Sequence, residues 1–221
     1  KLSYRYLNLP NVQGKSRPST FDLGQFSMPY FITSTILFVA ALIIIFWIHN
    51  QYHLDIIVTP AKPPINPPLI SICVPARNEE NNIRRCAESA LAQDYLNLEV
   101  IVLDDRSTDA TLTQLKEIAS RDSRLIPISG SDLPEGWAGK PHALFQASAA
   151  AHGEWLCFVD ADTFLKPEAI SSVYAKAIET KADLFTTMNQ QILGSFWEKV
   201  VMPLVMTALS VGFSPRKVND P

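Results

Sequence analysis

The chain has 221 residues, a formal net charge of -3, and 19 Lys and Arg residues against 22 Asp and Glu residues. This length suits one sizeable domain with an appendage. Basic residues form no run of five or more, which argues against a nucleic-acid-binding protein. The three cysteines, Cys73, Cys86 and Cys157, are scattered and odd in number. They favour a reduced cytosolic setting over a disulfide framework and form no zinc-like cluster.

A long apolar segment lies near the start of the chain. No Asp, Glu, Lys or Arg occurs between Asp22 and Asp55, and a helix of about 20 apolar residues crosses about 30 Å of hydrocarbon. We therefore expect a transmembrane helix over residues 28–50, after a juxtamembrane segment over residues 1–27. Four basic residues before this helix favour a cytoplasmic N-terminus. The chemistry inferred below instead needs the following domain to face the cytoplasm, and we give that chemistry more weight.

Five prolines between residues 59 and 68 predict an extended linker, which we assign to residues 51–68. Short apolar runs then alternate with helical stretches. Strands are expected over residues 69–74, 98–103, 125–128, 155–159 and 184–187, and helices over residues 81–93, 110–121, 142–151 and 167–180. This alternation predicts an α/β domain over residues 69–190, with a mainly parallel sheet flanked by helices.

Polar clusters follow the first two expected strands, and ligands of α/β sheets bind beyond the carboxyl ends of strands. Arg77 and Asn78 follow the first strand and can offer polar groups to a base or phosphate, although an ordinary helix cap explains Asn78 equally well. Asp104 and Asp105 follow the second strand. Adjacent side chains point to opposite faces, so one acid should face the crevice, where a carboxylate can accept an N–H from a nucleotide base. Ser107 and the two residues after it are more typical of helix capping.

A third cluster precedes a helix and contains Gly136, Trp137, Gly139, Lys140 and His142. Lys140, near a helix start, can place its positive charge against a diphosphate. The alternatives are a solvated lysine and a first-turn histidine without a role in binding. Trp137 is either a platform for a sugar or an anchor for its loop.

Asp160 and Asp162 follow directly after the expected strand over residues 155–159. Positions two apart in a strand share a face, so both carboxylates can point beyond the same edge of the sheet. Mg²⁺ or Mn²⁺ favours such oxygen ligands and is often held by one or two carboxylates together with substrate phosphates. A solvated turn is the alternative, because Asp-x-Asp is common by chance.

In chain order the clusters read Pro-Ala-Arg-Asn-Glu, Asp-Asp-Arg-Ser-Thr-Asp, Gly-Lys-x-x-Ala and Asp-x-Asp. As a set, over residues 69–187, they resemble the family 2 glycosyltransferases, which implies the Rossmann-like GT-A fold and a UDP- or GDP-sugar donor. The implied nucleotide-sugar-binding residues are Pro75, Ala76, Arg77, Glu79, Asp105, Lys140, Asp160 and Ala161. The resemblance implies that Asp105 contacts the base and that Lys140 lies near the diphosphate. Asp160 and Asp162 would be catalytic and would bind Mg²⁺ or Mn²⁺, with Asp162 as the main ligand.

The apolar segment and the Trp-Ala-Gly-Lys-Pro form of the third cluster resemble the membrane-bound branch of the family, which glycosylates hydrophobic acceptors such as carotenoid or hopanoid lipids. Family members carry a further acidic residue, the general base, after the fifth strand. After Glu198 the only acid is Asp220, so we expect a C-terminally truncated, donor-binding half of an enzyme whose general base is not in the chain. A membrane-attached nucleotide-binding module without activity and a nucleotidyltransferase are the alternatives.

Residues 191–221 form the last expected segment. Its apolar stretch is interrupted by Glu198, Lys199 and Pro203, so it is too short past the charges for a membrane span. A helix at the membrane surface that guides a lipid acceptor is one interpretation. A packing helix of a larger protein is the other.

Overall fold

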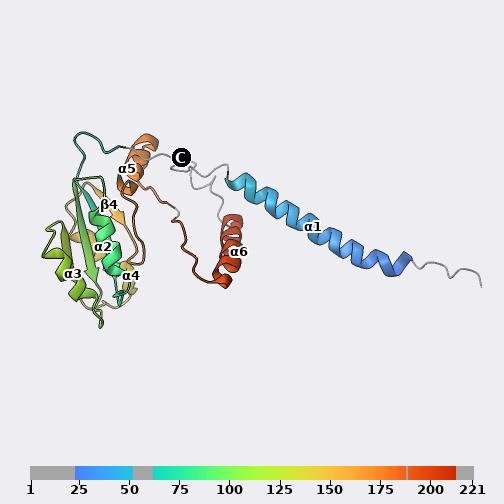
Figure 1. Cartoon of the computed structure of the whole chain (residues 1–221), viewed down its shortest axis with the longest axis horizontal. Helices are drawn as coiled ribbons and strands as arrows, with labels where there is room; N and C mark the ends of the chain where they lie inside the picture. Colours follow the sequence, from blue (N-terminus) through green and yellow to red (C-terminus); the bar gives the residue numbers. More distant parts are fainter. Residues whose placement is uncertain (1–22, 52–61, 188, 213–221) are drawn as a thin grey trace, which may run out of the picture. The chain divides into compact units, whose positions relative to one another are not determined.

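The computed structural model describes residues 23–51, 62–187 and 189–212 (Figure 1). The chain divides into an α/β unit within residues 56–190 and a helical unit made of residues 1–55 and 191–221. Most of the expected juxtamembrane segment, part of the linker and the C-terminal tail lie outside the described residues. The described part of the linker, residues 62–68, has neither helix nor strand.

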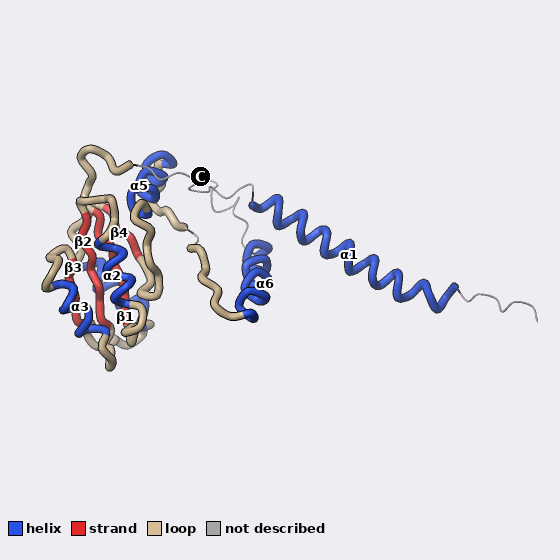
Figure 2. Tube along the Cα trace, in the orientation of Figure 1, coloured by secondary structure: helices blue, strands red, loops and turns tan. Residues whose placement is uncertain are grey.

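The α/β unit alternates strands with helices, as the sequence predicts (Figure 2). Its elements are β1 (Ile70–Ala76), α2 (Ile83–Leu91), β2 (Leu98–Asp104), α3 (Thr111–Ala119), β3 (Leu125–Ser129), α4 (Gly139–Ala149), β4 (Trp155–Phe158) and α5 (Ala169–Thr180). Within the described residues the strands form one sheet in the order β3-β2-β1-β4, and every pairing is parallel. The expected α/β fold is confirmed.

Helices cover both faces of the sheet, because the central strands are apolar on both faces. On one face, Ile72 and Val74 of β1 pack with buried side chains of α2, α3 and α5. On the other face, Cys73 of β1 and Ile101 and Leu103 of β2 pack with alanines of α4. Burial raises the pKa of Cys73 to about 11, so this thiol is neutral and acts as a core side chain.

Most element ends lie within two residues of the sequence-based expectation, and two features differ by more: a strand is missing and a helix begins early. The prediction of a fifth strand over residues 184–187 is wrong. These residues are irregular, and Leu184 is 89% exposed. A four-residue strand needs burial or a partner strand to be stable, and Leu184 gains no burial here. Helix α4 begins at Gly139, three residues before its expected start. Pro141 is compatible with this earlier start, because the first turn of a helix does not use the missing N–H.

Gly153, between α4 and β4, lies unusually close to the start of β1. A Cβ atom added at Gly153 would lie 2.6 Å from both the backbone N and the Oγ of Ser71, and 2.8 Å from the carbonyl oxygen of Leu69. We therefore expect Gly153→Ala to lower the free energy of unfolding by about 1–3 kcal/mol, the usual cost of overpacking. Urea denaturation should show a lower midpoint at unchanged slope. An unchanged midpoint would contradict this close approach.

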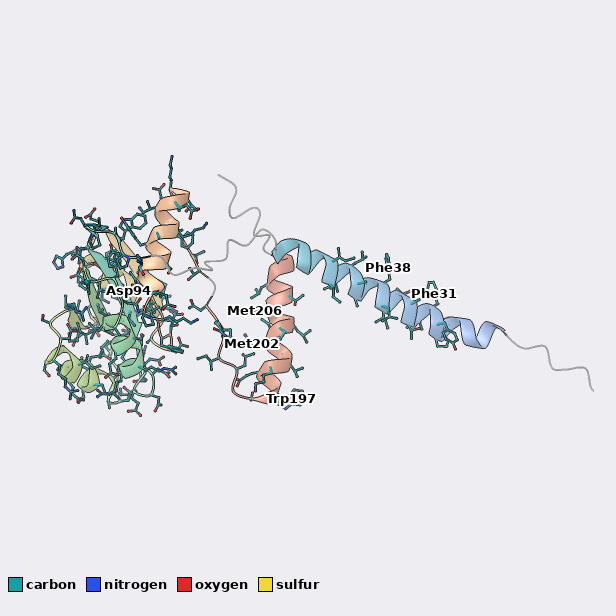
Figure 3. All side chains as sticks on the ribbon, turned by 45° about the horizontal axis from the view of Figure 1, so that its top comes forward. Phe31, Phe38, Asp94, Trp197, Met202 and Met206 are labelled. Atoms are coloured by element: carbon teal, nitrogen blue, oxygen red, sulfur yellow. The ribbon has the colours of Figure 1, made fainter. Side chains whose placement is uncertain are left out.

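The helical unit contains α1 (Leu23–Gln51) and α6 (Phe196–Gly212). Residues Met28–Ile45 of α1 have a mean hydropathy of 2.2 and no buried share, and α1 is long and apolar enough to cross a membrane. Phe31 and Phe38 project from it (Figure 3). Its hydroxyl groups bond within the helix: Thr35 Oγ1, for example, donates to the carbonyl oxygen of Phe31 at 2.8 Å. Such internal bonding satisfies polar groups where water is absent.

Candidate functional site

The strand order creates a natural crevice at one edge of the sheet. The chain builds β1, β2 and β3 outward in one direction and then returns to place β4 on the other side of β1. Ligands of open α/β sheets bind at such a reversal, outside the carboxyl ends of the strands. Here the two ends that flank the reversal carry Arg77, after β1, and Asp160 and Asp162, after β4.

A pocket of about 300 Å³ opens at this point. The residues that line it are Pro75, Ala76, Arg77, Glu79, Asp105, Gly139, Lys140, Ala143, Asp160, Ala161 and Asp162. All nine residues that the sequence singled out for donor or metal binding are brought together here. Gly139 and Ala143 were not assigned to the site, although both belong to the Gly-Lys-x-x-Ala motif. Their spacing of four residues places them on one face of a helix, and that signal could have found them.

One side of the pocket is formed by the end of β2. Asp104 is 3% exposed; its Oδ2 accepts a hydrogen bond from the N–H of Ser107 at 3.4 Å, and its Oδ1 has no hydrogen-bond partner among the described residues. Asp105 faces the pocket, with its carboxylate 3.1 Å from Arg106 Nε and 3.8 Å from Arg77 Nη1. Both acids are buried, with Asp105 only 7% exposed, but Asp105 lines the pocket and Asp104 does not. Asp105 Oδ2 lies toward Arg77 and so can accept hydrogen bonds from a ligand on that side.

The loops that carry Arg77 and Asp105 are bonded to each other. Asn78 has a left-handed backbone, with φ of 55°, which Asn tolerates better than most residues. Its N–H donates to Ser107 Oγ at 2.9 Å, and its Oδ1 accepts from the N–H of Thr108 at 2.8 Å. This reciprocal bonding gives Asn78, Ser107 and Thr108 a structural role. Contrary to the capping interpretation, none of the three caps a helix, because Asn82 precedes α2 and Ala110 precedes α3.

Asp109 continues this connection at the start of α3. Its Oδ1 accepts hydrogen bonds from Thr111 Oγ1 at 2.6 Å and from the Thr111 N–H at 3.0 Å, while Oδ2 accepts from the N–H of Glu80 at 3.1 Å. These bonds, above all that from the Thr111 hydroxyl, lower the pKa of Asp109. Asp109 is therefore a charged side chain that links the two loops by hydrogen bonds, and it does not line the pocket.

The other side of the pocket is formed by α4 and the turn after β4. Lys140 Nζ donates to Asp160 Oδ1 at 2.6 Å, and both side chains remain more than half exposed. The carboxylate of Asp162 makes no hydrogen bond or ion pair with the described residues. This side of the pocket thus holds two carboxylates. Asp160 is paired with Lys140, whereas Asp162 has no bonded partner among the described residues.

These two carboxylates suit a hard divalent cation. No group of three or more His, Cys, Asp and Glu residues in the described part of the chain could hold a metal by itself. Mg²⁺ and Mn²⁺ do not need such a cage, because substrate phosphates and waters complete their octahedron. Asp160 and Asp162 could therefore hold a cation together with the oxygens of a bound diphosphate.

Trp137 does not line the pocket. Its ring lies 5.4 Å from the rings of His142 and Phe145, and His142 is itself buried, with Nδ1 3.1 Å from Gln146 Nε2. Aromatic contacts of this kind fix the loop before α4. They favour the interpretation of Trp137 as a loop anchor.

The model of the glycosyl transferase family 2 matches residues 71–214, well over half of the chain. The chain belongs to this family. Glycosyltransferase GlyA of Streptococcus pneumoniae is 32% identical over 143 residues, which cover 59% of this chain and 20% of GlyA. The Escherichia coli enzyme WfaP, a UDP-Glc:alpha-D-GlcNAc-diphosphoundecaprenol beta-1,3-glucosyltransferase, is 34% identical over 128 residues, which cover 58% of this chain and 48% of WfaP.

Among solved structures, the mannosyltransferase PcManGT of Pyrobaculum calidifontis, in complex with GDP-Man and Mn²⁺, is similar to this family 2 chain with a TM-score of 0.49. It is 27% identical, and the match covers 69% of this chain and 43% of that one. This chain spans less than half the length of GlyA and of WfaP. The expected membership of family 2 is confirmed.

Proposed function

We propose that this family 2 glycosyltransferase moves a sugar from a nucleotide-diphosphate donor, a UDP- or GDP-sugar, to the hydroxyl group of a lipid-type acceptor. Asp162 and Asp160 would hold Mg²⁺ or Mn²⁺ at this site. The observation that carries this proposal is the single pocket shared by Asp105, Lys140, Asp160 and Asp162, which come from three separate segments of the chain. Charged side chains that are far apart in the sequence thus lie together beyond the carboxyl ends of the strands, where ligands of open α/β sheets bind.

Donor binding follows from the two sides of the pocket. Asp105 accepts an N–H from the base, and Arg77, Glu79 and the small residues Ala76 and Ala161 line the space for the nucleoside. The name of WfaP gives UDP-Glc as its donor, which supports a nucleoside diphosphate as the carrier here.

In the transfer step the acceptor oxygen attacks the anomeric carbon while the bond from that carbon to the diphosphate breaks. Resemblance to the family implies inversion in this single displacement. Lys140, in the first turn of α4, donates to the departing diphosphate, and the helix N-terminus favours the same negative charge. A bound divalent cation would supply Lewis-acid neutralisation of that charge. The four carboxylates of the pocket serve the donor and the cation, so we assign the general base to residues outside the pocket.

The acceptor and the membrane are inferred from the helical unit and from the relatives. The names of WfaP and of a Campylobacter jejuni glucosyltransferase 33% identical over 119 residues include undecaprenol, a lipid carrier. Residues 28–50 of helix α1 would span the membrane, with the α/β unit in the cytoplasm. Helix α6 would lie at the membrane surface, because Phe196, Trp197 and Leu204 are all at least two-thirds exposed.

The test is a transfer assay with the full-length protein in lipid nanodiscs, a set of UDP- and GDP-sugars, Mn²⁺ and an undecaprenyl-type acceptor. We expect Mn²⁺-dependent release of a nucleoside diphosphate that requires both donor and acceptor. Release of pyrophosphate from a nucleoside triphosphate would instead identify a nucleotidyltransferase. Donor binding without release under any condition would identify a non-catalytic module.

A further inference from the structure

A row of side chains on α2 and just beyond its end bonds to the chain segment of residues 159–170, which contains Asp160 and Asp162. This α2 row consists of Cys86, Ser89 and Gln93, whose spacing of three and four residues places them on one face of a helix. The Cys86 thiol donates to the carbonyl oxygen of Asp160 at 3.7 Å. Ser89 Oγ accepts from the N–H of Leu165 at 2.9 Å.

Gln93 makes the most extensive of these contacts. Its Nε2 donates to the carbonyl oxygens of Lys166 at 2.8 Å and Ser89 at 2.9 Å, and its Oε1 accepts from the N–H of Ile170 at 3.0 Å. The side chain is only 4% exposed. A buried amide with three partners holds its neighbours in one geometry, because each broken bond would leave a buried polar group unsatisfied.

The segment needs this support because it is irregular. Residues 159–168 contain turns but neither helix nor strand. Their internal backbone bonds include Thr163 N–H to Asp160 O at 2.9 Å, and the Ala169 N–H adds a bond to Lys166 O at 3.0 Å. Backbone groups without a regular partner are satisfied from outside, and the α2 row provides partners at several points along this segment.

We propose that Ser89 and Gln93 are positioning residues for the metal side of the pocket. Neither lines the donor pocket, so both act through the backbone of the segment that begins with Asp160 and Asp162. The inference rests on the proposed function, in which Asp162 binds the cation. The base side of the pocket has its own support, the bonding of Asn78 to Ser107 and Thr108. Loosening the α2 row therefore weakens metal-dependent binding and leaves binding of the base intact.

Two variants, Ser89→Ala and Gln93→Met, remove parts of the α2 row. Tyr95→Phe is the matched control, because it removes a partly buried hydrogen bond of the same region, from Tyr95 Oη to the carbonyl oxygen of Pro68 at 2.8 Å, and this bond does not involve the segment. Amide hydrogen exchange on the metal-free protein comes first. We expect about threefold to tenfold faster exchange at Leu165 in Ser89→Ala and at Ile170 in Gln93→Met, and no change at either amide in Tyr95→Phe.

The affinity for UDP, and for GDP as a second probe, is then measured with and without Mn²⁺. We expect the factor by which Mn²⁺ raises the affinity to fall about tenfold or more in both variants, as for other groups that orient metal ligands, with unchanged affinity in the absence of Mn²⁺. Tyr95→Phe should keep the full factor. Ser89→Ala alone decides the question if Gln93→Met does not fold.

The outcomes separate the inference from the proposed function. If Mn²⁺ raises nucleotide affinity in the unaltered protein and equally in Ser89→Ala, the positioning role is overturned. Equal losses with and without Mn²⁺ would also overturn it, because they indicate a general loss of stability. If Mn²⁺ has no effect on the unaltered protein, the proposed metal-dependent function fails instead.

Discussion

Asp162→Asn should abolish the gain in nucleotide affinity that Mn²⁺ provides and lower the transfer rate by about 10²–10³-fold, the effect of removing one group that stabilises transition-state charge. The substitution keeps the volume of the side chain and removes its charge. The Asp162 carboxylate is exposed and makes no bond with the described residues, so the free energy of unfolding should change by less than about 0.5 kcal/mol. Calorimetric titration of UDP or GDP with and without Mn²⁺ measures the affinity.

The control for this substitution is Asp183→Asn. Asp183 is also exposed, lies in the same α/β unit and does not line the pocket. It should keep both the Mn²⁺ effect and the transfer rate. If Asp162→Asn binds the nucleotide as tightly as the unaltered protein at every Mn²⁺ concentration, Asp162 is not a metal ligand.

Lys140→Met should lower the transfer rate by about 10²–10³-fold while leaving the protein folded. The ion pair between Lys140 and Asp160 is more than half exposed on both sides, and such pairs contribute only about 0–1 kcal/mol to stability. The loss of rate would therefore come from the missing positive charge at the diphosphate. It should appear mainly in kcat, because the negative charge on the leaving group grows in the transition state.

Lys140→Arg separates charge from shape at the same position. Arginine keeps the positive charge but presents a planar group with different geometry, so we expect it to recover part of the lost rate. Thermal unfolding of both variants should match the unaltered protein within a few degrees. Full turnover in Lys140→Met would show that this lysine does not act on the leaving group.

The sequence predicted the sheet well because its strands are almost wholly apolar and are separated by helices with polar faces. Ile72, Val74, Val100 and Val102 are fully buried, and runs of such residues identify strands covered on both faces. The segment around Leu184 looked similar in isolation. Whether a short apolar run becomes a strand depends on its burial by other parts of the chain, which periodicity does not report.

The candidate site was predictable as a set of residue types but not as a set of contacts. Alternation along β2 implied that one of Asp104 and Asp105 faces the crevice, but not which one. The α2 row could not be found from the sequence, because Ser89 and Leu165 are 76 positions apart and Gln93 and Ile170 are 77 positions apart. A serine on a helix and a glutamine just beyond its end are ordinary surface residues until the fold places a backbone segment against them.

The most direct test of the shared pocket is a crystal structure of the protein with UDP or GDP and Mn²⁺, in which anomalous scattering locates the cation. The proposed function predicts an Mn²⁺ ion bound to the Asp162 carboxylate and the diphosphate, with the base against Asp105. A nucleotide and cation bound at another surface, with Asp105 and Asp162 both free of them, would contradict it.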